Sequence, residues 1–164
     1  QTSDGGYLIG GYTVSSSEEV PAPLGESDFW ILKTDSEGNE EWQKRFGGSD
    51  HEQCTAVVET NNGEFIATGR TRSLDIDVST SFGSFDFWTI KLDAEGNLIW
   101  EQSHGGSYND QPNAIGVTPS GNILIAGHTG SNDGGVTFSN GDIDAWIVVP
   151  VSYIHLRDHE TPEL

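Results

Sequence analysis

The chain has 164 residues, and its 26 Asp and Glu against 7 Lys and Arg give it a formal net charge of −19. A nucleic-acid-binding protein needs a basic surface to displace counterions from phosphates, so this charge excludes nucleic acid and anionic membranes as partners. No apolar run approaches the roughly 18 residues of a membrane-spanning helix, so we expect no membrane span.

The amino-terminal part of the chain predicts two strands joined by a long loop. Residues 7–13, YLIGGYT, are short, apolar and β-prone, and residues 14–27 form a loop rich in Ser, Glu, Pro and Gly. Residues 29–35 are the next predicted strand. The following turn, Ser36-Glu37-Gly38-Asn39, places a glycine where a short hairpin loop needs a positive φ.

Two more strands follow before the pattern starts again. Residues 40–46 form the third predicted strand, and the pair Gly47-Gly48 breaks it. Residues 54–60 form the fourth strand, and Asn61-Asn62-Gly63 turns into the next copy. The chain shows no helical periodicity, so four short antiparallel strands per copy predict an all-β protein.

The elements return with a fixed period of 58 residues. The tripeptide DFW at residues 28–30 recurs at 86–88 and, as DAW, at 144–146. The signature positions of the repeat are Trp30, Trp88 and Trp146; Trp42 and Trp100; Gly38 and Gly96; and Gly11, Gly69 and Gly127. A fixed period of this length is typical of repeat architectures.

The second strand of each copy indicates how the copies are arranged. The segments FWILK and FWTIK are apolar on both faces, so both faces of their sheets should be covered. Four-stranded antiparallel sheets that cover one another, head to tail, are the blades of a β-propeller. We therefore predict an incomplete propeller of about two and a half blades over residues 1–149, with Trp side chains between blades and glycines at sharp turns or close approaches.

These residues carry a family resemblance. The order of double glycine, DFW, D-x-E-G-N and a second Trp resembles kelch repeats, and KLDAEGNLIW resembles the tryptophan-docking repeats of quinoprotein-type propellers. The whole pattern is similar to repeats of secreted or surface-anchored propeller proteins of Bacteroidetes-like bacteria. The resemblance implies a secreted or cell-surface location, further blades in a parent protein, and a non-catalytic binding or scaffold role toward protein or glycan.

Residues 150–164 depart from the repeat. They lack the D-x-E-G-N turn and the second Trp, and SYIHLRDHETPEL resembles a translated sequencing-adaptor read-through at the ends of metagenome-derived reading frames. We expect this tail to be non-native. His155 and His159 have the i, i+4 spacing of zinc ligands on a helix, but their place in the tail argues against a metal site.

The loops between the first and second strands hold the candidate binding residues. These loops are acidic and differ from copy to copy while the strands stay alike, and variable loops on a constant scaffold commonly carry function. The candidate ligand or cation contacts are Asp75, Asp77, Asp133 and Asp142. Ca²⁺ is the one cofactor that these carboxylates indicate, although solvated loops without a ligand are the favoured alternative.

No catalytic constellation is visible, so we expect no enzyme activity from this chain. Cys54 has no His partner in the sequence pattern and is predicted to be a small buried hydrophobe. His51, His104 and His128 occupy three different repeat positions, which argues against a shared catalytic ring. Two alternatives remain: a fragment of a propeller enzyme (kelch-like oxidase, quinoprotein or glycosidase), and a lectin-like sugar-binding module.

Overall fold

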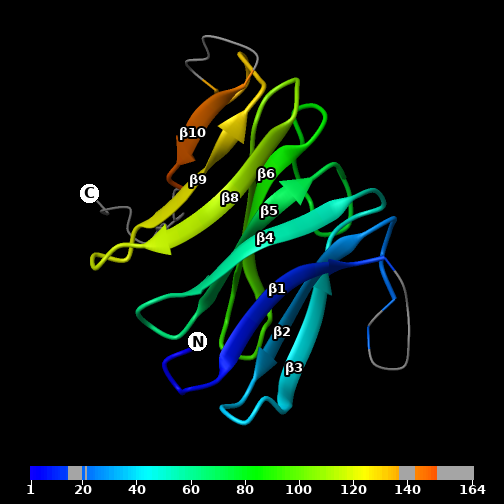
Figure 1. Ribbon diagram of the computed structural model, residues 1–164. Helices are drawn as coiled ribbons and strands as arrows, with labels where there is room; N and C mark the ends of the chain where they lie inside the picture. Colours follow the sequence, from blue (N-terminus) through cyan, green and yellow to red (C-terminus); the bar gives the residue numbers. More distant parts are fainter. Residues whose placement is uncertain (15–19, 21, 137–142, 151–164) are drawn as a thin grey trace, which may run out of the picture.

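The computed structural model describes residues 1–14, 20, 22–136 and 143–150, and within them the protein is all-β (Figure 1). Ten antiparallel strands form three sheets, which confirms the predicted all-β class. No helix in these ranges is long and apolar enough to cross a membrane. The predicted strands at residues 7–13 and 40–46 match the observed boundaries, and the other two begin one or two residues earlier than predicted.

Each sheet is built from strands that are consecutive in the chain. The first sheet contains β1 (Tyr7–Thr13), β2 (Asp28–Thr34) and β3 (Glu40–Phe46); the second contains β4 (Glu52–Glu59), β5 (Phe65–Thr71), β6 (Asp86–Leu92) and β7 (Leu98–His104); the third contains β8 (Asp110–Val117), β9 (Ile123–Thr129) and β10 (Asp144–Val148). Every neighbouring pair of strands is antiparallel.

The boundary between sheets differs from the one that the sequence indicated. The strand after the double glycine was expected to be the last of its copy, but β4 pairs with β5 and opens the second sheet. The chain therefore changes sheet at Gly47-Gly48, and again at Gly105-Gly106. Of the three described sheets, only the second has four strands.

The sheets pack face to face along two seams, each with its own apolar core. The first seam joins the first and second sheets, where Trp88 packs edge-on against Phe29 with ring centroids 4.7 Å apart. The second seam joins the second and third sheets, where Trp146 packs against Phe87 at 4.8 Å. One repeated contact between a Trp and the preceding sheet's Phe therefore closes both seams.

The middle sheet is covered on both faces, as the apolar second strand of each copy indicated. Phe87, Trp88 and Ile90 of β6 are fully buried, because the first seam covers one face and the second seam covers the other. In β2 of the first sheet, by contrast, Trp30 is only partly buried, and its indole N–H donates to Gln43 Oε1 at 2.8 Å.

The D-x-E-G-N segments are tight turns held by their own side chains. Gly38 and Gly96 have φ values of +88° and +78°, which L side chains rarely adopt. Asp35 accepts hydrogen bonds from the Glu37 and Asn39 backbone N–H groups and from the Asn39 amide. The Asn39 side chain lowers the pKa of Asp35, so the carboxylate is an acceptor within the turn.

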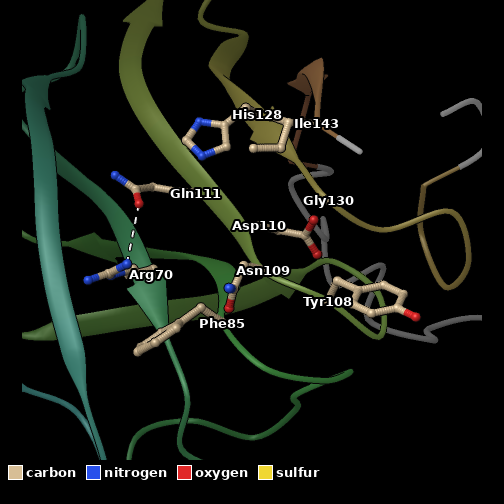
Figure 2. A pocket seen from close by; sticks show the side chains of 9 residues that line it. All are labelled: Arg70, Phe85, Tyr108, Asn109, Asp110, Gln111, His128, Gly130 and Ile143. Atoms are coloured by element: carbon tan, nitrogen blue, oxygen red, sulfur yellow. Dashed lines mark hydrogen bonds between the residues drawn. The ribbon is translucent and has the colours of Figure 1, made fainter. Parts of the chain in front are cut away.

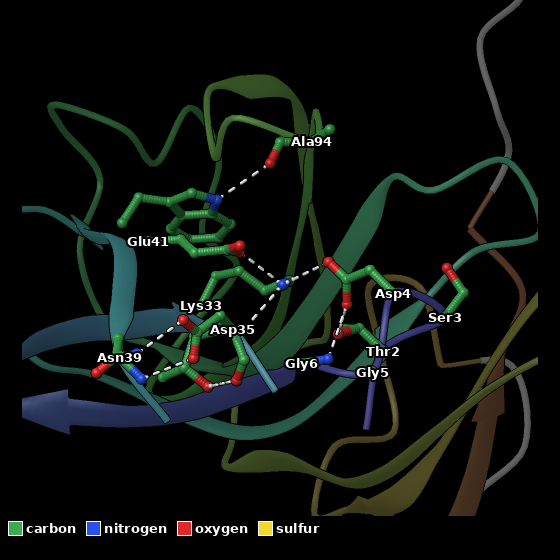
Figure 3. A network of polar contacts seen from close by, with 12 residues as sticks. Thr2, Ser3, Asp4, Gly5, Gly6, Lys33, Asp35, Asn39, Glu41 and Ala94 are labelled. Atoms are coloured by element: carbon green, nitrogen blue, oxygen red, sulfur yellow. Dashed lines mark hydrogen bonds and ion pairs between the residues drawn. The ribbon is translucent and has the colours of Figure 1, made fainter. Parts of the chain in front are cut away.

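A buried lysine joins the outer hairpin of the first sheet to the amino-terminal turn (Figure 3). Lys33 Nζ bonds Asp4 at 2.8 Å, Glu41 at 2.7 Å and the Thr34 carbonyl at 2.9 Å. Burial lowers the pKa of Lys33, but the hydrogen bonds to Asp4 and Glu41 outweigh it and raise that pKa above its usual value. The hydrogen bond from Lys33 also holds the pKa of Asp4 well below its usual range.

Candidate functional site

The acidic loop residues that the sequence singled out fasten one sheet to the next. Asp75 accepts a hydrogen bond from the Ser49 backbone N–H at 2.8 Å, and Asp133, one repeat later, accepts one from Ser107 at 2.7 Å. Asp77 accepts one from the Gly47 backbone N–H at 3.1 Å. Each loop therefore pins the double-glycine turn of the preceding copy.

These carboxylates are engaged in the seams. The hydrogen bonds from Ser107 lower the pKa of Asp133, as expected for an ionised acceptor. In the part of the chain that the structure describes, no three His, Cys, Asp or Glu side chains gather closely enough to hold a metal ion. Asp142 and the tail residues His155 and His159 lie outside the described residues.

Two of the repeated tryptophans pack between sheets, and two of the repeated glycines lie close to the neighbouring strand of their own sheet. Trp42 packs against Phe65 and donates to the Ala94 carbonyl at 3.0 Å, and Trp100 packs on the second core. A Cβ on Gly69 would overlap the carbonyl oxygen of Gln53 in β4, and one on Gly127 would overlap that of Gln111 in β8.

Gly11 differs from the expectation of a close approach. A Cβ on Gly11 would meet nothing within 4 Å. Its strand β1 lies at the edge of the described first sheet, whereas β5 and β9 each have a further strand beside them. The open space at Gly11 thus follows from its strand position.

A buried pair of carboxylates lies under the first double glycine. Asp28 and Glu52 are both fully buried, and a Cβ on Gly47 would overlap an oxygen of Asp28 and lie 2.6 Å from Glu52 Oε2. Glu52 accepts hydrogen bonds from the Thr71 hydroxyl and the Gly48 N–H, both at 2.7 Å. Asp28 Oδ1 has no hydrogen-bond partner among the described residues.

The same arrangement returns at the second double glycine. Asp86 and Asp110 are fully buried, and Gly105 leaves room for both carboxylates. Within the described part of the chain, Asp86 Oδ1 again has no hydrogen-bond partner. Burial, and then the neighbouring acid, raise the pKa of Asp28 and of Asp86 above the usual value for an aspartate.

The most distinctive hollow is a pocket of about 340 Å³ at one end of the second seam (Figure 2). We call it the second-seam notch. Its lining comes from both sheets and their loops: Arg70, Phe85, Tyr108, Asn109, Asp110, Gln111, His128, Gly130 and Ile143. Polar, aromatic and cationic groups thus converge at one place, as is common for ligand sites.

Arg70 is held in position by neutral groups. Its Nε and Nη2 donate to Gln53 Oε1 at 3.2 and 2.7 Å, and its Nη1 donates to Gln111 Oε1 at 3.3 Å. The guanidinium carbon lies 4.4 Å from the centre of the Phe85 ring, a cation–π contact. The described residues give Arg70 no carboxylate partner.

The equivalent place at the first seam has different side chains. There Arg72 pairs with Asp50 at 3.6 Å and lies 5.9 Å from the Phe85 ring. One repeat later the Arg72 position is Gly130, and the Asp50 position is Tyr108. The backbone is unchanged, because Arg72 N–H donates to a carbonyl at 3.0 Å and Gly130 N–H donates to the equivalent carbonyl at 2.8 Å. The missing side chain therefore leaves the notch open.

Sequence reasoning overlooked this site. It searched for chemistry shared by the copies, whereas the notch is made by positions at which the copies differ. Arg70 takes the place that Tyr12 and His128 occupy in the other copies. A comparison of cationic positions between copies would have flagged Arg70, Arg72 and Gly130, although not the hollow that they surround.

Cys54 and His104, two residues that the sequence analysis considered, are both affected by burial. Cys54 is buried in the first core, and burial raises the pKa of its thiol to about 12, which confirms the predicted hydrophobic role. Burial also lowers the pKa of His104, whose Nε2 has no hydrogen-bond partner in the ranges that the structure describes.

Neither a protein-family model nor a curated protein sequence matches this chain. A functional assignment therefore depends on the geometry of the notch.

Proposed function

We propose that the three sheets are blades of an incomplete β-propeller, and that the chain is a non-catalytic binding module of a secreted or cell-surface protein. Two seams with the same Trp–Phe contact and the same buried acid pair support this proposal, because a propeller is built by repeating one such seam. The proposed partner is a protein or a glycan.

The second-seam notch carries the binding role. Its single decisive feature is Arg70, a cation without a carboxylate partner among the described residues, in a chain with a net charge of −19. At the equivalent place of the first seam, Arg72 pairs with a carboxylate, Asp50, at 3.6 Å. Arg70 is instead oriented by two glutamines toward an open pocket.

The test fills the notch with the side chain that the first seam already carries. Gly130→Arg should occupy the pocket while the fold stays intact, because Arg72 has the same backbone contact. The labelled parent chain should bind members of a glycan or peptide array, and Gly130→Arg should lose that binding. Gly116→Arg is the matched control, because a Cβ on Gly116 would meet nothing within 4 Å and Gly116 lies outside the notch. Binding by the parent that Gly130→Arg leaves unchanged would contradict the proposal.

A further inference from the structure

We infer that the second-seam notch selects a carboxylate-bearing sugar, such as a hexuronate residue of an acidic glycan; this inference rests on the binding function proposed above. Three features of the notch support this inference: the free donors of Arg70, the charges around it, and the shape and polarity of the remaining lining.

Arg70 keeps donors for a ligand. A guanidinium has five N–H groups in a planar fork that matches the two oxygens of a carboxylate. Three of these groups are used by Gln53 and Gln111. The remaining two belong to Nη1 and Nη2, one on each nitrogen. Because the Phe85 ring and the glutamines fix the plane, little side-chain entropy is lost when a ligand binds.

Asp110 is the acid among the described residues that line the notch, and its oxygens are already engaged. They accept hydrogen bonds from the Thr129 hydroxyl, the Gly106 N–H and the Ser131 hydroxyl. The long-range repulsion of an anion by the net negative charge is screened over about 10 Å at 0.1 M salt. A short-range contact with Arg70 can therefore decide selectivity.

The rest of the lining fits a sugar ring. Tyr108 is 61% exposed, so its ring offers an apolar surface against which the C–H face of a pyranose can pack. Gln111, Asn109 and His128 add polar groups that can hydrogen-bond to hydroxyls. The volume of about 340 Å³ lies at the small end of ligand pockets and suits one compact ring better than an extended peptide.

The experiment compares acidic oligosaccharides with their carboxyl-reduced counterparts, which differ only by CH₂OH in place of COO⁻. Galacturonate, glucuronate and mannuronate oligomers are titrated into the full chain by calorimetry. At least one acidic oligomer should bind at least tenfold more tightly than its reduced form, since a charge-assisted bidentate contact exceeds the 1.4 kcal/mol of a tenfold change. Arg70→Gln should remove that difference, and Lys44→Gln, an equal charge change on β3 outside the notch, should preserve it.

The outcomes separate the two proposals. Equal binding of acidic and reduced oligomers, lost in Gly130→Arg, would overturn carboxylate selection and leave the binding function standing. Tighter binding of a Glu-rich peptide than of every uronate would overturn the sugar assignment. If none of the sugars and no peptide on the array bound the chain, the proposed function would fail, and this inference with it.

Discussion

The first and second seams have the same core contacts, but they differ in the side chains at the end of the seam where the notch lies. Both have a Trp against the preceding Phe, at 4.7 and 4.8 Å, and both bury two carboxylates under a double glycine. At that end, Arg72 and Asp50 form an ion pair at the first seam, whereas Gly130 and Tyr108 line a pocket at the second. The repeat thus fixes how sheets stack, and a few substitutions between copies decide where a ligand could enter.

The two seams also differ in how deeply their tryptophans are buried. Trp88 is fully buried between two sheets, while Trp146 in the third sheet is only partly buried. We therefore expect the Trp88 contact to contribute more to the free energy of unfolding than the equivalent Trp146 contact does. The largest effect that we predict tests this difference.

Trp88→Ala should destabilise the protein strongly. The change removes the packing on Phe29 and the hydrogen bond to Glu101 at 2.8 Å, and it leaves a cavity at the first seam. We expect a loss of about 3–5 kcal/mol in the free energy of unfolding. The matched change Trp146→Ala should cost about half as much, since less apolar surface is buried there. Urea unfolding of the two variants measures both losses in the free energy of unfolding. Equal losses would contradict the prediction, because they would show that both Trp–Phe contacts stabilise the protein to the same extent.

Gly69→Ala should be the next largest effect. An added Cβ would overlap the Gln53 carbonyl oxygen in β4, and backbone cannot move as a flexible side chain can. We expect a loss of about 1–3 kcal/mol, typical of overpacking. Gly11→Ala, at the same repeat position but in open space, should stay within about 0.5 kcal/mol of the parent. A comparable loss at Gly11 would mean that another segment packs beside β1 in solution.

Much of the fold could be predicted from the sequence because its signals are local or periodic. The apolar DFW strands, the Gly38 and Gly96 turns and the 58-residue period follow from residue types and spacing alone. The sheet boundary could not be predicted in that way. Whether β4 pairs with the strand before or after it depends on long-range packing against β1 and β8, which the period leaves open.

The site was harder to predict than the fold for a physical reason. Asp75, Asp77 and Asp133 lie in variable acidic loops, and such loops either bind ligands or hydrogen-bond backbone. The structure shows the second outcome for these three, because each accepts a hydrogen bond from the preceding double-glycine turn. The notch depends on which side chain is missing at Gly130, and a missing side chain gives no sequence motif.

The smallest predicted effect concerns the buried acids, one pair at each seam. The pKa of Asp28 and of Asp86 is raised by burial in the folded protein, so the folded state binds these protons more tightly than the unfolded state does. Their contribution to stability is therefore full below the usual aspartate pKa and is lost as the pH rises through the raised value. Asparagine resembles the protonated acid, so Asp28→Asn and Asp86→Asn should each slightly stabilise the protein at pH 7.

The turn aspartates provide a control of opposite sign. The Asn39 and Asn97 side chains lower the pKa of Asp35 and Asp93, so stability from these turns is present above the usual aspartate pKa and is lost as the pH falls. Asp35→Asn should therefore destabilise at pH 7, and its effect should shrink in acid. Urea unfolding from pH 3 to pH 7 should show the two classes of variant moving in opposite directions. If Asp28→Asn changed the stability at pH 7 and Asp86→Asn did not, the buried acids of the two seams would contribute differently to stability.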